Sequence, residues 1–224
     1  KPGETFRQEV AFDVTGPRDY ADLIFDKIEN IVTANSQYVA LARNPQQLYA
    51  NKAAGKKSIV LGIENGLAIE NDLANVAHFA QRGVTYITLC HNGDNDICDS
   101  ARGTATHGGV SDFGRRVIEE MNRTGIMVDL SHGAESSFYD ALEISSVPIV
   151  CSHSNCKALC DVPRNLTDNQ MRALAQKGGV AHITMYQGFL KKGSEATVMD
   201  AIAHLEHAIK IMGIDHVGIG TDFD

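Results

Sequence analysis

The stretch GIMVDLSHGAESSFYDALEISSVPIVCSHSNCKALCDVPR, residues 125–164, contains two apolar runs that each end in Ser-His. The first run covers residues 126–132 and the second covers residues 147–153. A continuous apolar run of this length, bounded by turn residues, indicates a strand that is buried on both faces, as in a parallel sheet. This stretch therefore predicts two neighbouring parallel strands.

The segment between the two runs, residues 135–145, carries Phe138, Ala141 and Leu142 at helical spacing. A strand–helix–strand unit brings the ends of its strands to one face of the sheet, so His132 and His153 are expected to lie together. Two imidazoles presented in this way can hold a metal ion. A single histidine at the end of a strand usually has only a structural role. Two such histidines in register, with a carboxylate upstream, favour a metal site.

The rest of the chain repeats the alternation of strand and helix. Strands are expected at residues 58–63, 84–90, 126–132, 147–153, 180–185 and 217–221. Amphipathic helices are expected between them, and another over residues 18–34. Regular alternation predicts an α/β fold with a parallel sheet, here a (β/α)8 TIM barrel. A doubly wound open sheet is the alternative, although no glycine-rich dinucleotide or phosphate loop follows a strand.

Chemically useful side chains end most of the expected strands: Glu64, His91, His132, His153 and Asp222. Polar residues at the C-terminal ends of several strands are what a barrel active site requires. The other six histidines lie on expected helices, in loops or within strands, where packing or surface roles are expected: His78, His107, His182, His204, His207 and His216.

Composition narrows the class of protein. The 224 residues are 43% hydrophobic and carry a formal net charge of −8, which is ordinary for a globular domain and argues against a nucleic-acid-binding face. No apolar run is long enough to cross a membrane, and no secretory signal opens the sequence; the cellular compartment stays open. The five cysteines do not form a disulfide pattern.

The strand-end residues suggest their chemistry. Glu64, His132 and His153 suit a divalent ion such as zinc, and a carboxylate can also bridge two metals. Asp222 can orient a water molecule or carry a proton, and His91 can stabilise a developing oxyanion. Arg164 suits bidentate recognition of a carboxylate. Together these residues predict metal-assisted hydrolysis of a small anionic substrate.

Six short motifs, in order, resemble the membrane (renal-type) dipeptidases, the M19 metallopeptidases. They are GIENG (62–66), TLCHNGDN (88–95), VDLSH (128–132), CSHSN (151–155), PRN (163–165) and GTDFD (220–224). The resemblance runs from about residue 11 to residue 224. It implies an amidohydrolase-like barrel with two zinc ions that cleaves small dipeptides, and it leaves open whether the protein forms a homodimer.

The resemblance also implies a role for each matching residue. Glu64 would bridge the two zinc ions, and His132 and His153 would hold the second one. His91 would bind substrate and stabilise the tetrahedral intermediate, and Arg164 would take the terminal carboxylate. Asp222, rather than Asp224, would serve the water or the leaving amine.

One family feature has no counterpart here. The family carries a His-x-Asp pair at the end of its first strand, and no such pair occurs in this sequence. We therefore expect residues 1–224 to form one partial metallo-dependent hydrolase domain, without the first strand, most of the second and the closing helix. One metal position or none would then be filled. The alternatives are a non-catalytic barrel remnant and another amidohydrolase that acts on cyclic amides or lactones.

Overall fold

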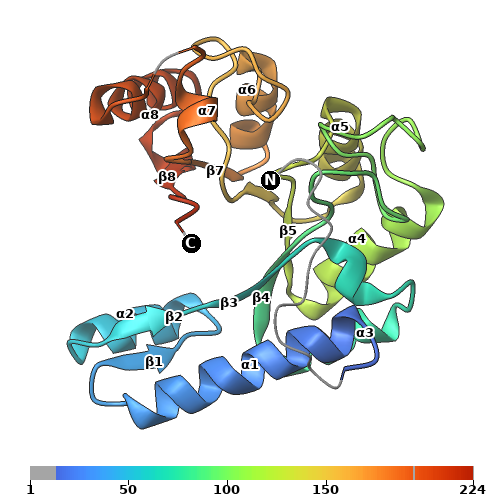
Figure 1. The fold of residues 1–224 in the computed structure, drawn as a ribbon, viewed down its shortest axis with the longest axis vertical. Coiled ribbons are helices and arrows are strands. Elements are labelled where there is room, and N and C mark those ends of the chain that lie inside the picture. Colours follow the sequence, from blue (N-terminus) through green and yellow to red (C-terminus); the bar gives the residue numbers. More distant parts are fainter. Residues whose placement is uncertain (1–13, 194, 224) are drawn as a thin grey trace.

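The computed structural model describes residues 14–193 and 195–223, and six parallel strands form the main sheet of these residues. Their order in the sheet, β3-β4-β5-β6-β7-β8, is also their order in the chain (Figure 1). The strands are β3 (Leu61–Glu64), β4 (Val84–Thr88), β5 (Met127–Asp129), β6 (Val150–Cys151), β7 (Val180–Ile183) and β8 (Val217–Ile219). The predicted set of consecutive parallel neighbours is confirmed.

Helices connect the strands and lie on the outer side of the sheet (Figure 1). The α-helices are α1 (Pro17–Ala34), α2 (Pro45–Ala53), α3 (Ala74–Arg82), α4 (Asp112–Thr124), α5 (Glu135–Ile144), α6 (Asp168–Gln176), α7 (Gln187–Leu190) and α8 (Val198–Met212). Two short 3-10 helices are η1 (Gly66–Ile69) and η2 (Ile214–His216). Within the described residues, no helix combines the length and the apolar character that a membrane span requires.

Local capping explains where the helices begin and end. The Ser111 hydroxyl accepts from the Gly114 amide at the start of α4, and Gly125 ends that helix with φ at 83°. Thr167 and Gln170 form the expected capping box at the start of α6. Such caps satisfy backbone groups that a helix leaves unpaired at its ends, so these helices have defined lengths and return the chain to the sheet.

The predicted strand at residues 58–63 is two strands in the structure. Lys57–Ile59 forms β2, which pairs with β1 (Val39–Leu41) in a separate two-stranded parallel sheet, and only Leu61–Glu64 joins the main sheet. Val60 lies between them and is exposed. An apolar run indicates that a segment is buried, but it does not indicate which strand the segment pairs with. The split of residues 57–64 into two strands could therefore not be predicted from the sequence.

The other predicted strands are longer than the paired segments. Leu89, Cys90 and Leu130 are fully buried although they lie just beyond β4 and β5. Burial therefore continues after the backbone has left the hydrogen-bonded ladder. As a result, His91, His132 and Asp222 each lie three residues beyond the end of a strand, on the segment that turns away at the rim.

The core fills the space between the sheet and the outer helices. Its fully buried large side chains include Phe79 of α3, Ile118 and Met121 of α4, Phe138 of α5 and Leu174 of α6. Phe25 of α1 meets Phe79 edge to face, with ring centroids 6.4 Å apart, and so attaches α1 to α3. Because the strands are parallel, all their C-terminal ends lie at one rim, where the predicted site residues gather.

Candidate metal centre

The three predicted metal ligands, Glu64, His132 and His153, converge at the C-terminal rim. Glu64 ends β3, while His132 and His153 follow β5 and β6. Glu64 Oε1 lies 3.1 Å from His132 Nε2 and 3.3 Å from His153 Nε2, and the two imidazole nitrogens are 2.9 Å apart. Both imidazoles are buried, whereas the Glu64 side chain is 46% exposed.

This triangle of atoms fits a zinc ion. Tetrahedral zinc binds imidazole nitrogen and carboxylate oxygen at about 2.0–2.2 Å, which places neighbouring ligand atoms about 3.3–3.6 Å apart. The three observed separations, 2.9, 3.1 and 3.3 Å, fall at or just below this range. One carboxylate and two imidazoles also match the donor types that zinc prefers. The residues present therefore suit the metal that the sequence motifs implied.

The electrostatics favour the protonation states that ligands need. The hydrogen bond from His132, the largest contribution, holds the pKa of the Glu64 carboxyl well below its ordinary value. Burial lowers the pKa of His132 to about 4, although Glu64 opposes this shift. At neutral pH the carboxylate is charged and the His132 imidazole is neutral, so both can donate electron pairs to a cation.

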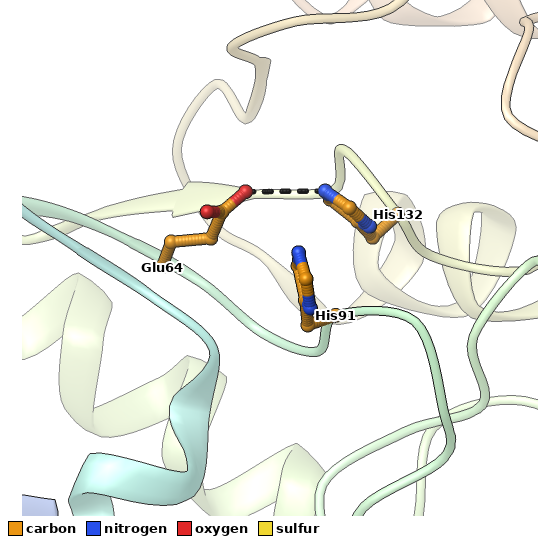
Figure 2. A group of neighbouring side chains, drawn as sticks. All are labelled: Glu64, His91 and His132. Atoms are coloured by element: carbon orange, nitrogen blue, oxygen red, sulfur yellow. Dashed lines mark ion pairs between the residues drawn. The ribbon is translucent and has the colours of Figure 1, made fainter. Parts of the chain in front are cut away.

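His91 lies in the same group of side chains. Glu64, His91 and His132 present ligand atoms that are all within 4.8 Å of one another, and Figure 2 shows the three side chains directed toward a common point. The His91 and His132 ring centroids are 4.3 Å apart. The family resemblance implied a substrate-binding role for His91, and the structure places its imidazole beside Glu64 and His132. Burial lowers its pKa.

The backbone of His91 is held by the loop that follows β4. Ser100 Oγ donates to the His91 carbonyl at 2.5 Å, and the same hydroxyl lies 3.3 Å from the His132 carbonyl. The Asp94 carboxylate accepts from the amides of Ser100, Thr104 and Thr106 and so closes the loop on itself. The two histidine-bearing segments are therefore joined by one serine.

Arg164 is buried behind the cluster, with 3% of its surface exposed. Its Nη2 donates to the His153 carbonyl at 3.2 Å, and its guanidinium lies 5.3 Å from the centroid of the Phe189 ring. Nε has no hydrogen-bond partner among the described residues. Burial lowers the pKa of Arg164 to about 10, still far above neutral, so the group stays charged. Arg164 is therefore a buried cation and not a surface residue.

Asp222 lies at the same rim but is exposed. It lines a cavity of about 220 Å³ together with Glu64, Ser152 and His153. Its φ of 60° lies in the left-handed region, which is uncommon for a residue with a side chain. The structure thus places Asp222 beside the metal ligands with open space between them. Asp224, the less favoured alternative, is outside the described residues.

The other histidines and the cysteines have structural contacts. His78 and His207 pair with Asp22 and Asp168, each at 2.8 Å, and His204 is buried between backbone groups. All five cysteines are free and buried. Among the described residues, none of them joins the group of potential metal ligands.

Sequence reasoning missed the groups that orient His153. The carboxylate of Asp129 is fully buried and hydrogen-bonded to Thr88 and Ser152, and Ser152 in turn contacts His153 Nδ1 at 2.8 Å. The available signal was an acidic residue inside the otherwise apolar run IMVDL. A buried carboxylate needs partners, so its presence in a strand marks a polar network.

A parallel barrel-wall sheet with a carboxylate and imidazoles at its C-terminal rim defines the class of amidohydrolase-like barrels. Residues 21–224 match the sequence profile of the membrane dipeptidases, peptidase family M19. The chain belongs to this family.

Individual relatives agree with this assignment. An uncharacterized dipeptidase of Schizosaccharomyces pombe is 41% identical over 175 residues, which is 76% of this chain and 42% of that protein. The crystal structure of an amidohydrolase from Pseudomonas aeruginosa is 34% identical with a TM-score of 0.84, over 89% of this chain and 61% of that one.

A metallo peptidase from Rhodobacter sphaeroides, liganded with a phosphinate mimic of the dipeptide L-Ala-D-Ala, has a TM-score of 0.83 at 27% identity. It is matched over 89% of this chain and 59% of its own. The predicted barrel fold is confirmed by these neighbours. The chain spans about half the length of the curated relatives it matches.

Proposed function

We propose that this chain carries the site of a zinc-dependent dipeptidase, which hydrolyses the peptide bond of small dipeptides. The observation that carries the proposal is the convergence of Glu64 Oε1, His132 Nε2 and His153 Nε2 within 2.9–3.3 Å of one another. These three residues would hold the metal. A bound zinc ion supplies a Lewis acid that polarises the substrate carbonyl and activates water.

The remaining residues would bind and orient the substrate. His91 would donate a hydrogen bond to the carbonyl oxygen as negative charge develops on it. Arg164 would pair with the terminal carboxylate of the dipeptide through its planar fork. Asp222, across the cavity from His153, would accept a proton from the attacking water and return it to the leaving amine.

The substrate class has support from one relative. The metallo peptidase from Rhodobacter sphaeroides was solved with a mimic of L-Ala-D-Ala, a dipeptide with a free carboxylate. A buried, charged Arg164 close to the cluster fits such a substrate. A cyclic amide or lactone offers no carboxylate, which weighs against that alternative. A non-catalytic remnant has no need for a neutral His132 facing a charged Glu64.

The number of metal ions follows from the ligands present. The sequence contains no His-x-Asp pair, which in the family holds the first zinc. The described cluster therefore supplies ligands for one position, and we propose at most one zinc per chain in these residues. Binding of a second zinc ion would require ligands other than those of this cluster.

The test is a comparison of metal content and activity in matched histidine variants. His132→Ala removes a proposed ligand, whereas His78→Ala removes a histidine that pairs with Asp22 away from the cluster. We expect zinc content, measured by mass spectrometry after dialysis, to fall in His132→Ala and to persist in His78→Ala. Hydrolysis of a panel of dipeptides by the full-length protein should follow zinc content. Unchanged zinc stoichiometry in His132→Ala would exclude it as a ligand.

A further inference from the structure

One buried carboxylate joins the ends of three neighbouring strands beneath the metal centre. Asp129 ends β5 and is fully buried. One of its oxygens accepts from the backbone amides of Ser131 and Ser152, at 3.0 and 2.9 Å. The other accepts from the hydroxyls of Thr88 on β4 and Ser152 after β6, at 2.6 and 2.5 Å. Four hydrogen bonds therefore converge on the two oxygens of this carboxylate.

The Ser152 hydroxyl links the Asp129 carboxylate to the imidazole of His153. A serine hydroxyl has one hydrogen to donate and lone pairs to accept with. Its hydrogen goes to Asp129, whose carboxylate oxygen accepts the short hydrogen bond from the Ser152 hydroxyl. The Ser152 oxygen lies 2.8 Å from His153 Nδ1 and must therefore accept a hydrogen there. Nδ1 consequently carries the proton, and Nε2 is left with a free lone pair.

That lone pair faces the other proposed ligands. His153 Nε2 lies 3.3 Å from Glu64 Oε1 and 2.9 Å from His132 Nε2. The opposite tautomer would present a hydrogen to the metal position and prevent coordination. His132 differs, since its Nδ1 is buried without a hydrogen-bond partner among the described residues. Of these two imidazoles, only His153 has a hydrogen-bonding neighbour at Nδ1 among the described residues.

We propose that Asp129 and Ser152 are positioning residues that fix His153 as the Nδ1–H tautomer and direct its Nε2 to the metal. The inference rests on the proposed metal site, but the tautomer itself is a property of the metal-free chain. Outer groups that orient a metal-binding histidine typically contribute a factor of about 10–100 in metal affinity. The competing explanation is that the Asp129 network only ties the strands together.

Three variants separate these explanations. Ser152→Ala removes both the hydrogen bond to Asp129 and the contact with His153. Thr88→Val removes a hydrogen bond to the same Asp129 oxygen but leaves Ser152 and His153 in place. Ser152→Thr retains a hydroxyl. Ser152→Ala and Thr88→Val both remove a hydroxyl hydrogen bond to the same Asp129 oxygen, so a comparison of their thermal stabilities controls for the strand-tying role.

Two measurements are made on the full-length protein. Zinc affinity is measured by competition with a chelating dye. The tautomers of His132 and His153 are read in the zinc-free protein from the nitrogen chemical shifts of the imidazoles. We expect Ser152→Ala to weaken zinc binding by about 10–100-fold and to give a mixture of His153 tautomers. Thr88→Val and Ser152→Thr should keep the zinc affinity and the single Nδ1–H form.

The outcomes distinguish the two proposals. Equal losses of zinc affinity in Ser152→Ala and Thr88→Val would overturn the positioning role, as would a single His153 tautomer that persists in Ser152→Ala. If the wild-type protein binds no zinc, the proposed function fails. The nitrogen spectra of the metal-free protein still decide whether Ser152 sets the tautomer of His153.

Discussion

Two of the candidate site residues adopt backbone conformations that side chains usually avoid. His132 has φ at 75° and Asp222 has φ at 60°. A non-glycine residue in the left-handed region carries strain of about 1–3 kcal/mol, and such residues cluster at functional sites. Both residues lie just beyond strand ends, where the backbone turns. At His132 this backbone conformation accompanies the 3.1 Å contact between its Nε2 and Glu64 Oε1.

The prediction at this scale concerns Arg164. A charge-assisted hydrogen bond contributes about 1.5–3 kcal/mol, or roughly one to two powers of ten in binding. We expect Arg164→Ala to lower kcat/KM for a dipeptide by at least that factor. The variant should also narrow the difference between the dipeptide and its C-terminal amide, because only the dipeptide offers a full carboxylate. Both constants are measured for this substrate pair.

Arg164 is buried, so its loss could also disturb packing against Phe189. Arg164→Lys keeps a positive charge and serves as the matched control, with zinc content and thermal stability recorded for both variants. An unchanged ratio between dipeptide and amide in Arg164→Ala would show that another group receives the carboxylate.

At the scale of elements, the loop after β6 is held in place by a histidine of α8. His204 Nδ1 accepts from the Cys156 amide at 3.0 Å, and its Nε2 lies 3.0 Å from the Leu190 carbonyl at the end of α7. This loop carries Arg164. The position of a proposed substrate-binding residue therefore depends on a helix that contributes no residue to the metal cluster.

This contact predicts a dependence of stability on pH. Burial lowers the pKa of His204 below its ordinary 6.5. Below pH 6.5 the unfolded chain binds a proton that the folded chain does not, so the free energy of unfolding falls as the pH falls. The loss is at most about 1.4 kcal/mol per pH unit for one proton.

Urea unfolding of the metal-free protein between pH 7 and pH 5 measures how steeply the free energy of unfolding falls with pH. His204→Gln should reduce this slope. Other titrating groups, His132 among them, contribute equally to wild type and variant, so the difference between the two slopes isolates His204. Identical slopes would contradict a role for its neutral form.

At the scale of the whole molecule, the proposed centre joins segments that are distant in the sequence. Glu64, His91, His132 and His153 follow four consecutive strands of one sheet. A zinc ion held by Glu64, His132 and His153 would link β3, β5 and β6, so its binding free energy would add to the stability of the fold. In the absence of a ligand, these strand ends depend on networks such as that of Asp129.

We therefore expect zinc to stabilise the chain against heat. At a free zinc concentration 100 times the dissociation constant, linkage predicts a gain of about 2.7 kcal/mol, or roughly 5–10 °C in Tm for a chain of this size. Differential scanning calorimetry with zinc, with magnesium and with a chelator measures the shift. His78→Ala should retain the shift, and His132→Ala should lose most of it. Equal shifts in the two variants would place the zinc elsewhere.

The sequence by itself determined the order of strands and helices and the residues that end the strands. Both follow from local patterns, since apolar runs report burial and parallel strands separated by helices bring their ends to one rim. It also determined the family, because six motifs occur in series. The positions of Glu64, His91, His132 and His153 were predictable for this reason.

Only the tertiary structure revealed which side chains on neighbouring strands contact one another. Asp129 meets Thr88 and Ser152, which lie 41 and 23 positions away in the chain. The burial of Arg164 and the pairing of β1 with β2 are of the same kind. An apolar pattern carries no information about which partner a buried polar group or a strand edge finds. That choice is made by packing, because every buried charge and backbone group must be satisfied at once.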